Sequence, residues 1–232
     1  MLIEPEISAV SIILIGSFNP KIFSPDWFAR HGLITEQDAE DADLGIVHPD
    51  ITQFRTTNFM LGVEHGKFSI QTTQAPYVRI KDLTTKIFGT LLPHTPISIL
   101  GINREVHINL TNQKLRDKIG YTLAPPDAWG KWAPEIVAGE GNRHGGMLSV
   151  TMQVRALDDR ARGHRQATVQ PSFRIPNSTG IFIQVNDQFE LEENKVAIDA
   201  SEIIAHLDKG FDASIREAEF IIDQVTELKN GD

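Results

Sequence analysis

The segment IIAHLDKGFDASIREAEFIIDQVTEL, residues 203–228, decides the fold of this chain. Apolar side chains recur through it every three or four residues: Ile204, Leu207, Phe211, Ala218, Ile221, Val225 and Leu228. This period predicts an amphipathic α-helix of about seven turns, or two helices broken near Gly210, with Ser214 as the one polar residue in the series. Three further residues, Ile203, Ile215 and Ile222, widen the apolar stripe, so a helix that covers a sheet is favoured over a coiled-coil seam.

The chain before this helix contains the strands that it would cover. Apolar or alternating segments predict strands at residues 7–16, 51–63, 67–73, 97–110, 148–155, 166–173 and 181–185. Shorter helices are expected after Ser24, Thr35 and Asn112, which are cap residues, and over residues 76–92. The order predicts an α+β fold: mainly antiparallel sheet covered by helices, with a long amphipathic C-terminal helix.

The clearest alternation lies in residues 148–155. Leu148, Val150, Met152 and Val154 alternate with polar residues there, which predicts a half-buried antiparallel strand. Gly163 supplies the turn toward the next strand, in which Ala167 and Val169 are expected to face the core.

Residues 124–146 show no period and are rich in proline and glycine. A loop of this length is functional, disordered or a linker. We therefore expect an N-terminal α+β unit over residues 1–123, a loop or linker over residues 124–146, and an antiparallel meander plus the C-terminal helix over residues 147–232. A single domain that contains both units is the alternative.

Composition limits the possible functions. The chain has 232 residues, a formal net charge of -9 and no cysteine, which excludes disulfides, thiolate metal sites and cysteine nucleophiles. The first residues lack the basic and apolar pattern of a secretory signal, and the apolar run over residues 10–15 is too short to span a bilayer. We expect a cytoplasmic protein without membrane association.

No motif predicts catalysis, a metal site or a cofactor. The glycine-rich run over residues 139–146 has no lysine followed by Ser or Thr, and the serine-hydrolase elbow Gly-x-Ser-x-Gly does not occur. The eight histidines are scattered without metal-ligand spacing. An enzyme is therefore less favoured than a binding protein. If the chain is an enzyme, its active site is of an unfamiliar kind and lies within residues 124–146.

Half of the twelve arginines lie within 32 residues of this acidic chain: Arg143, Arg155, Arg160, Arg162, Arg165 and Arg174. Only Asp158 and Asp159 oppose them locally, whereas both ends of the chain are acidic. The favoured interpretation is that these arginines pair with acids of the same chain or of another copy. The alternatives are a different protein partner, or phosphate groups of a nucleic acid gripped by the hairpin over residues 155–165.

Trp129 and Trp132 lie three residues apart in the loop before this cluster. We expect them to pin the loop to the core, and the alternative is that they anchor a partner. Together with the six arginines they form the predicted partner-binding set.

Three patches resemble an uncharacterised, sporadically distributed bacterial protein family of similar length. They are residues 55–59 (RTTNF) at a hairpin, residues 101–103 (GIN) on a long strand, and the C-terminal helix; residues 16–20 (GSFNP) depart from the expected pattern. The family has no assigned catalytic residues, so the resemblance implies only a bacterial accessory or partner-binding role. We expect a non-enzymatic assembly component of a bacterial multi-protein system that self-associates, with a nucleic-acid-binding module as the alternative.

Overall fold

The computed structural model describes residues 1–139, 145–193 and 195–230, and it confirms an α+β fold with one antiparallel sheet. The strands are β1 (Ile7–Gly16), β2 (Asp43–His48), β3 (Ile51–Arg55), β4 (Met60–Glu64), β5 (Lys67–Thr72), β6 (Ile97–Asn109), β7 (Val150–Val154), β8 (Gly163–Pro171) and β9 (Gly180–Glu190). Their order across the sheet is β2-β3-β4-β5-β1-β6-β9-β8-β7.

The two predicted units share this sheet, because β6 of the first unit pairs with β9 of the second. The register runs without interruption from Ile99 opposite Glu190 to Asn109 opposite Gly180. On the other side of β6, β1 pairs with it over its whole length. The centre of the sheet therefore combines strands from both sides of residues 124–146.

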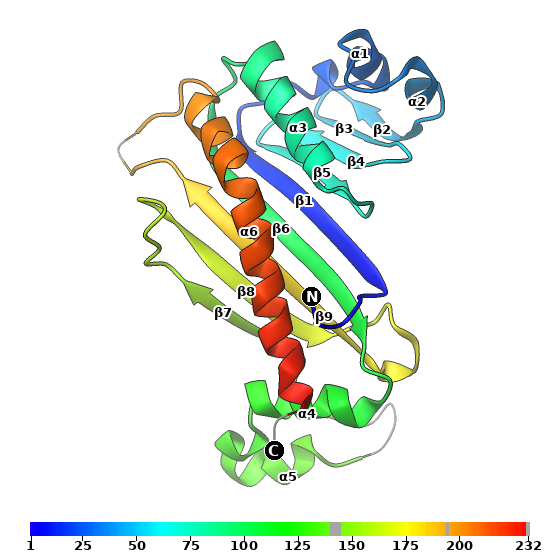
Figure 1. Ribbon diagram of the computed structural model, residues 1–232, viewed down its shortest axis with the longest axis vertical. Helices are drawn as coiled ribbons and strands as arrows, with labels where there is room; N and C mark the ends of the chain where they lie inside the picture. The colour runs from blue at the N-terminus through cyan, green and yellow to red at the C-terminus, as the bar shows by residue number, and fades with distance from the viewer. Residues whose placement is uncertain (140–144, 194, 231–232) are drawn as a thin grey trace.

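The helices lie around this sheet (Figure 1). The α-helices are α1 (Pro25–Arg30), α2 (Glu36–Glu40), α3 (Val78–Lys86), α4 (Gln113–Leu123), α5 (Ala133–Ile136) and α6 (Ser201–Glu227). The π-helix η2 (Ile87–Leu91) continues α3, and short 3-10 helices are η1 (Pro20–Ile22), η3 (Pro126–Trp132), η5 (Pro176–Ser178) and η6 (Leu228–Asn230). Ser24, Thr35 and Asn112 accept backbone hydrogen bonds at the starts of α1, α2 and α4, so the predicted caps are confirmed.

One face of the sheet carries the core. Figure 1 shows α6 crossing this face with α3 beside its N-terminal part, and α6 packs on β6 and β9. Alternate residues of the central strands, such as Ile12, Ile102 and Val185, are buried beneath this layer. Within the described residues, no helix has both the length and the apolar character needed to cross a membrane.

Helix α6 is a single helix of 27 residues, so the continuous helix is confirmed and the alternative of two helices broken near Gly210 is wrong. A Cβ at Gly210 would lie 3.4 Å from the ring of Phe189, which shows how closely the helix approaches β9 there. Ser214 is buried as the pattern requires, and its hydroxyl has a hydrogen-bond acceptor on the sheet. A glycine inside the helix thus serves close packing rather than a kink.

The prediction that residues 148–155 form a half-buried strand is wrong in its burial. β7 is the last strand of the sheet and, among the described residues, pairs only with β8; Met152 and Val154 are 70% and 56% exposed. The reason is the position of α6, which covers β6 and β9 and leaves the outer strand bare. Val169 of β8, one strand closer to the helix, is buried as expected.

Two other segments differ from the sequence expectations. Residues 51–72 form three strands, β3, β4 and β5, rather than the two expected over residues 51–63 and 67–73, and β2 is an additional strand on their outer side. Residues 124–146 contain η3 and α5, so part of the predicted loop is helical. Both differences involve short elements whose sequences carry little periodic signal.

Replacing Gly163 with alanine tests the junction between β8 and β9. Gly163 has φ +127°, and a Cβ would lie 2.0 Å from the carbonyl oxygen of Gln188. We expect Gly163→Ala to lower the free energy of unfolding by at least about 2 kcal/mol. The methyl group would strain the backbone at this positive φ and would clash with the carbonyl oxygen of Gln188. Urea denaturation measures this, and Gly66→Ala, which meets no atom within 4 Å, is the control. An equal effect of both variants would contradict the prediction.

Candidate functional site

The carboxylate of Asp187 lies in the middle of β9, facing α6, and is almost completely buried. Arg160 donates from Nη1 to Oδ1 at 2.7 Å, and Arg165 donates from Nη2 to Oδ2 at 3.3 Å. Ser214 of α6 donates from its Oγ to Oδ2 at 2.7 Å. Because these donors replace water around the carboxylate, the cluster neutralises its charge within the chain.

The guanidinium of Arg160 is enclosed by its neighbours. It lies over the ring of Phe189, 3.6 Å from the centroid, and it also donates to the carbonyl of Gln188 at 2.9 Å. Its Nη2 donates to Asp159 at 2.7 Å, and this hydrogen bond lowers the pKa of the Asp159 carboxyl. Stacking on an aromatic face and paired hydrogen bonds favour arginine over lysine at such a position.

Two more ion pairs involve the arginine segment. Arg165 also reaches Glu217 of α6 at 3.5 Å, and Arg162 reaches Glu190 of β9 at 3.4 Å. Arg160, Arg162 and Arg165 therefore pair with acids of the same chain, as the favoured interpretation expected. The acidic C-terminal helix supplies one of these acids.

Two of the other arginines, Arg155 and Arg174, do not join this cluster. Arg155 is exposed and donates to Gln153 at 2.7 Å, and Arg174 is exposed in the connection after β8. Neither forms an ion pair with any residue that the structure describes, and they lie at opposite ends of β8. Arg143 lies outside the described residues. The structure thus brings three predicted arginines together and separates two others.

Trp129 and Trp132 lie in η3, and their side chains are 58% and 53% exposed. Their rings contact each other edge to face, with centroids 5.6 Å apart. The prediction that they pin the loop to the core is wrong, because η3 presents them to solvent instead. A pair of exposed tryptophans remains available to a partner.

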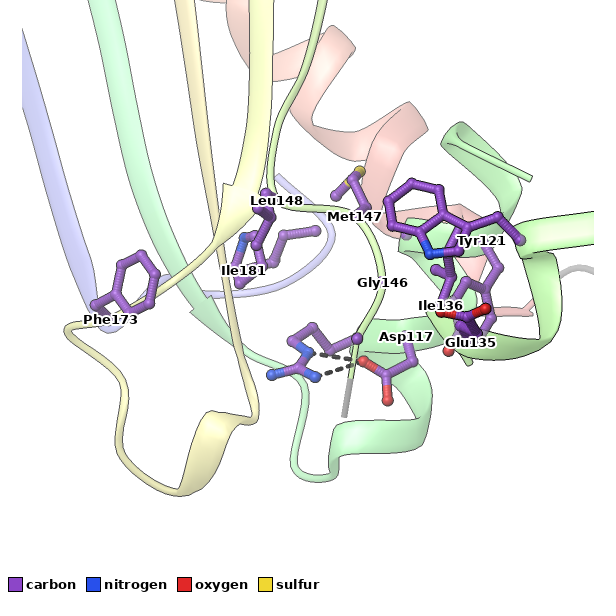
Figure 2. A pocket seen from close by; sticks show the side chains of 14 residues that line it. Asp117, Tyr121, Glu135, Ile136, Gly146, Met147, Leu148, Phe173 and Ile181 are labelled. Atoms are coloured by element: carbon purple, nitrogen blue, oxygen red, sulfur yellow. Dashed lines mark hydrogen bonds and ion pairs between the residues drawn. The ribbon is translucent and has the colours of Figure 1, made fainter. Parts of the chain in front are cut away.

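Trp132 borders a cavity of about 490 Å³ at the end of the sheet (Figure 2). Leu148, Phe173 and Ile181 lie on the sheet side of it, and Tyr121 and Ile136 lie on the side of α4 and α5. Its lining is mainly apolar, which is typical of a site for an apolar side chain rather than for a charged ligand.

Polar groups of α4 lie at the rim of this cavity. Arg116 pairs with Asp117 at 2.5 Å and donates to the carbonyl of Ser178 at 2.8 Å, which joins α4 to the end of η5, just before β9. Burial, with a contribution from the charge of Asp117, raises the pKa of Tyr121. The contacts of Arg116 with Asp117 and Ser178 therefore fix α4, which forms one wall of the cavity.

The cavity and the free edge of the sheet form one surface. Leu148, exposed and lining the cavity, precedes β7 by two residues, and Met152 and Val154 follow along the same strand. The alternation of β7 places Val150, Met152 and Val154 on one face of the sheet. We call Leu148, Met152, Val154 and the outer backbone of β7 the β7 surface.

Sequence reasoning missed one buried pair. Nδ1 of His107 and Oγ of Ser172 are 2.7 Å apart, although 65 residues separate them. The Ser172 oxygen also accepts from the backbone of Arg174 at 3.2 Å and of Ile175 at 3.3 Å, so it organises the turn after β8. A serine buried and engaged in this way is a structural group rather than an exposed nucleophile. The alternation of His107 on its strand was the only sequence signal for it.

The described residues contain no group of three or more His, Asp or Glu side chains that could hold a metal ion. Around the cavity and along β7, the described residues offer apolar side chains, exposed aromatic rings and unpaired strand backbone.

We expect Asp187→Asn to lower the free energy of unfolding by about 3–5 kcal/mol, because Arg160 and Arg165 then lose their buried counterion. Glu190→Gln removes the partner of the more exposed Arg162 and is expected to cost about 1 kcal/mol or less. Urea denaturation of both variants measures the difference. If both variants lost the same free energy of unfolding, the buried ion pairs of Asp187 would contribute no more than the exposed pair of Glu190.

Stability should also depend on His107. Burial, and then the nearby charge of Arg174, lower the pKa of His107, so the folded protein favours the neutral ring. This contribution is fully present above about pH 6.5, the usual histidine pKa, and is lost as the pH falls through the lowered folded value. His107→Gln retains a polar partner for Ser172 without this titration. The urea midpoint of wild type should therefore fall more steeply with acidification than that of the variant, and parallel curves would refute this.

No family model matches this sequence, and no curated protein matches it. The resemblance to the sporadically distributed bacterial family stays a prediction.

Proposed function

We propose that this protein is a non-enzymatic assembly component that binds another protein chain at the β7 surface. The observation that carries the proposal is the exposure of Met152 and Val154 on an outermost strand, on the face that is covered over the neighbouring strands. Exposed apolar side chains beside unpaired strand backbone are costly in water unless a partner covers them.

Strand addition is the mode of recognition that fits this surface. An incoming extended segment would hydrogen-bond to the outer backbone of β7, and its alternate side chains would lie beside Met152 and Val154. Main-chain bonds then supply affinity, and the apolar side chains supply specificity. β7 lies open to this because, among the described residues, no element pairs with its outer side.

The cavity at the end of the sheet gives such a segment an anchor. Leu148 belongs both to the cavity lining and to the approach to β7, so a chain that follows β7 reaches the cavity directly. Trp132 and Phe173 at its rim are exposed, and aromatic residues around an apolar pocket are frequent centres of binding energy.

The resemblance supports a bacterial multi-protein setting for such a role, and the absence of cysteine is consistent with the cytoplasm. The proposal favours a protein partner over a nucleic acid, because the hairpin over residues 155–165 uses Arg160 and Arg165 for Asp187. Exposed Arg155 and Arg174 lie at opposite ends of β8 and offer no continuous basic stripe for a phosphate backbone.

A labelled synthetic peptide of alternating valine and threonine, with lysines at its ends for solubility, tests strand addition at β7. We expect weak binding, with a dissociation constant of about 100 µM, and a loss of at least about tenfold in Met152→Glu, because the carboxylate would be desolvated beside the peptide. Fluorescence anisotropy measures the binding.

Ile46→Glu is the matched control, because Ile46 is an exposed apolar residue of β2, the opposite edge strand. It should bind the peptide like wild type. Absence of wild-type binding, or equal loss in both variants, would contradict a role for the β7 edge.

A further inference from the structure

The two edges of the sheet differ in how they resist pairing with another strand. At the β2 edge, the pairing with β3 shifts in register between Leu44 and Ile46, Asp43 begins the strand, and Pro49 follows it. Bulges, charges and prolines are the usual means by which proteins block an edge strand. β2 therefore carries a bulge and a charge within the strand and a proline directly after it.

β7 carries none of them. Its pairing with β8 is regular from Val150 opposite Val169 to Val154 opposite Arg165. The strand reads VTMQV, with no proline and no charged residue, and Arg155 follows only after its end. An edge without a blocking feature is expected where pairing is part of the structure's use.

The sequence of β7 is complementary to itself when two copies run antiparallel. All five residues of one strand overlap all five of the other only if Met152 lies opposite Met152 of the second copy. Val150 then lies opposite Val154 of the second copy, and Thr151 lies opposite its Gln153. Apolar side chains thus meet apolar ones on one face, and polar side chains meet polar ones on the other.

The charges next to the strand are compatible with the same register. Arg155 would lie opposite Ser149 of the second copy, so no like charges face each other directly. This matters because Arg155 has no ion-pair partner among the described residues, and two arginines facing each other would oppose pairing.

We infer that the chain seated on β7 is a second copy of this protein, paired antiparallel about a two-fold axis at Met152. The inference rests on the proposed function and names its partner. The pairing joins two nine-stranded sheets into one continuous sheet, with the same strand contributed by both subunits, as two-fold symmetry requires. Five residue pairs form a small interface, so we expect a dimer with a dissociation constant of about 10–100 µM.

The first experiment exploits charge at the two-fold axis. Light scattering after size exclusion, over a range of concentrations that spans this constant, should show a dimer for wild type. Met152→Glu and Met152→Lys should each weaken dimerisation at least about tenfold, because each places like charges opposite one another. An equal mixture of the two variants should recover the dimer, since glutamate then faces lysine. Ile46→Glu on β2 should dimerise like wild type.

The second experiment exploits the absence of cysteine from the chain. Directly opposite residues of an antiparallel pair have Cα atoms about 4.5–5.5 Å apart, a distance that a disulfide can bridge. Under a mild oxidant, Met152→Cys should form a covalent dimer. Val150→Cys and Val154→Cys should each cross-link poorly alone and readily when mixed, because they face each other only across the axis. Ile46→Cys should stay monomeric.

The outcomes separate this inference from the proposed function. A wild type that is monomeric throughout, or charge variants that dimerise like wild type, would overturn self-pairing. If the valine–threonine peptide still binds at β7 in that case, the proposed function stands and the partner is a different chain. If the peptide also fails to bind, both fall. Cross-linking of Val150→Cys alone would refute the register.

Discussion

The rest of the structure depends on the hydrogen bonds and ion pairs of the buried Asp187 carboxylate. Arg165 of β8, Arg160 of the β7–β8 connection and Ser214 of α6 all donate to it. Four segments of the chain therefore meet at one charge, and removing it would leave two cations without their shared counterion. A central charge that only one arrangement satisfies favours a single position of α6 over the sheet.

A second buried cation, Arg104, holds α6 against β6 and β1. Arg104 of β6 is almost fully buried, donates to the carbonyl of Ala9 and lies 3.6 Å from Glu219 of α6. With Asp187, it fixes α6 over β6 and β9. The bare outer strand follows from this placement, because a single helix is narrower than the sheet and its polar contacts keep it near the centre.

Local patterns predicted much of this fold. The apolar series from Ile204 to Leu228 gave the long helix, and Ser24 and Thr35 gave the caps, because these signals lie within a few residues of one another. Alternation in β7 indicated which residues share a face, but not whether anything covers that face. Asp187 lies 27 residues from Arg160, and Ser172 lies 65 residues from His107; no local pattern encodes such distant pairs. The sequence therefore pointed to Trp132 beside the cavity but not to the β7 surface, whose Met152 and Val154 were expected to be half-buried.

The arrangement of the central strands also limits the order in which the strands can pair as the chain is synthesised. β6 has β1 on one side, with Ile7 opposite His107, and β9 on the other, with Asn109 opposite Gly180. Its second neighbour is thus synthesised about seventy residues after β6 itself. During that interval the longest strand of the sheet has an open edge, and such distant pairings make folding slow. A chain that starts to fold during synthesis exposes the centre of its sheet until β9 has been made, and β7 takes its place at the edge only after β9 and β8 have paired.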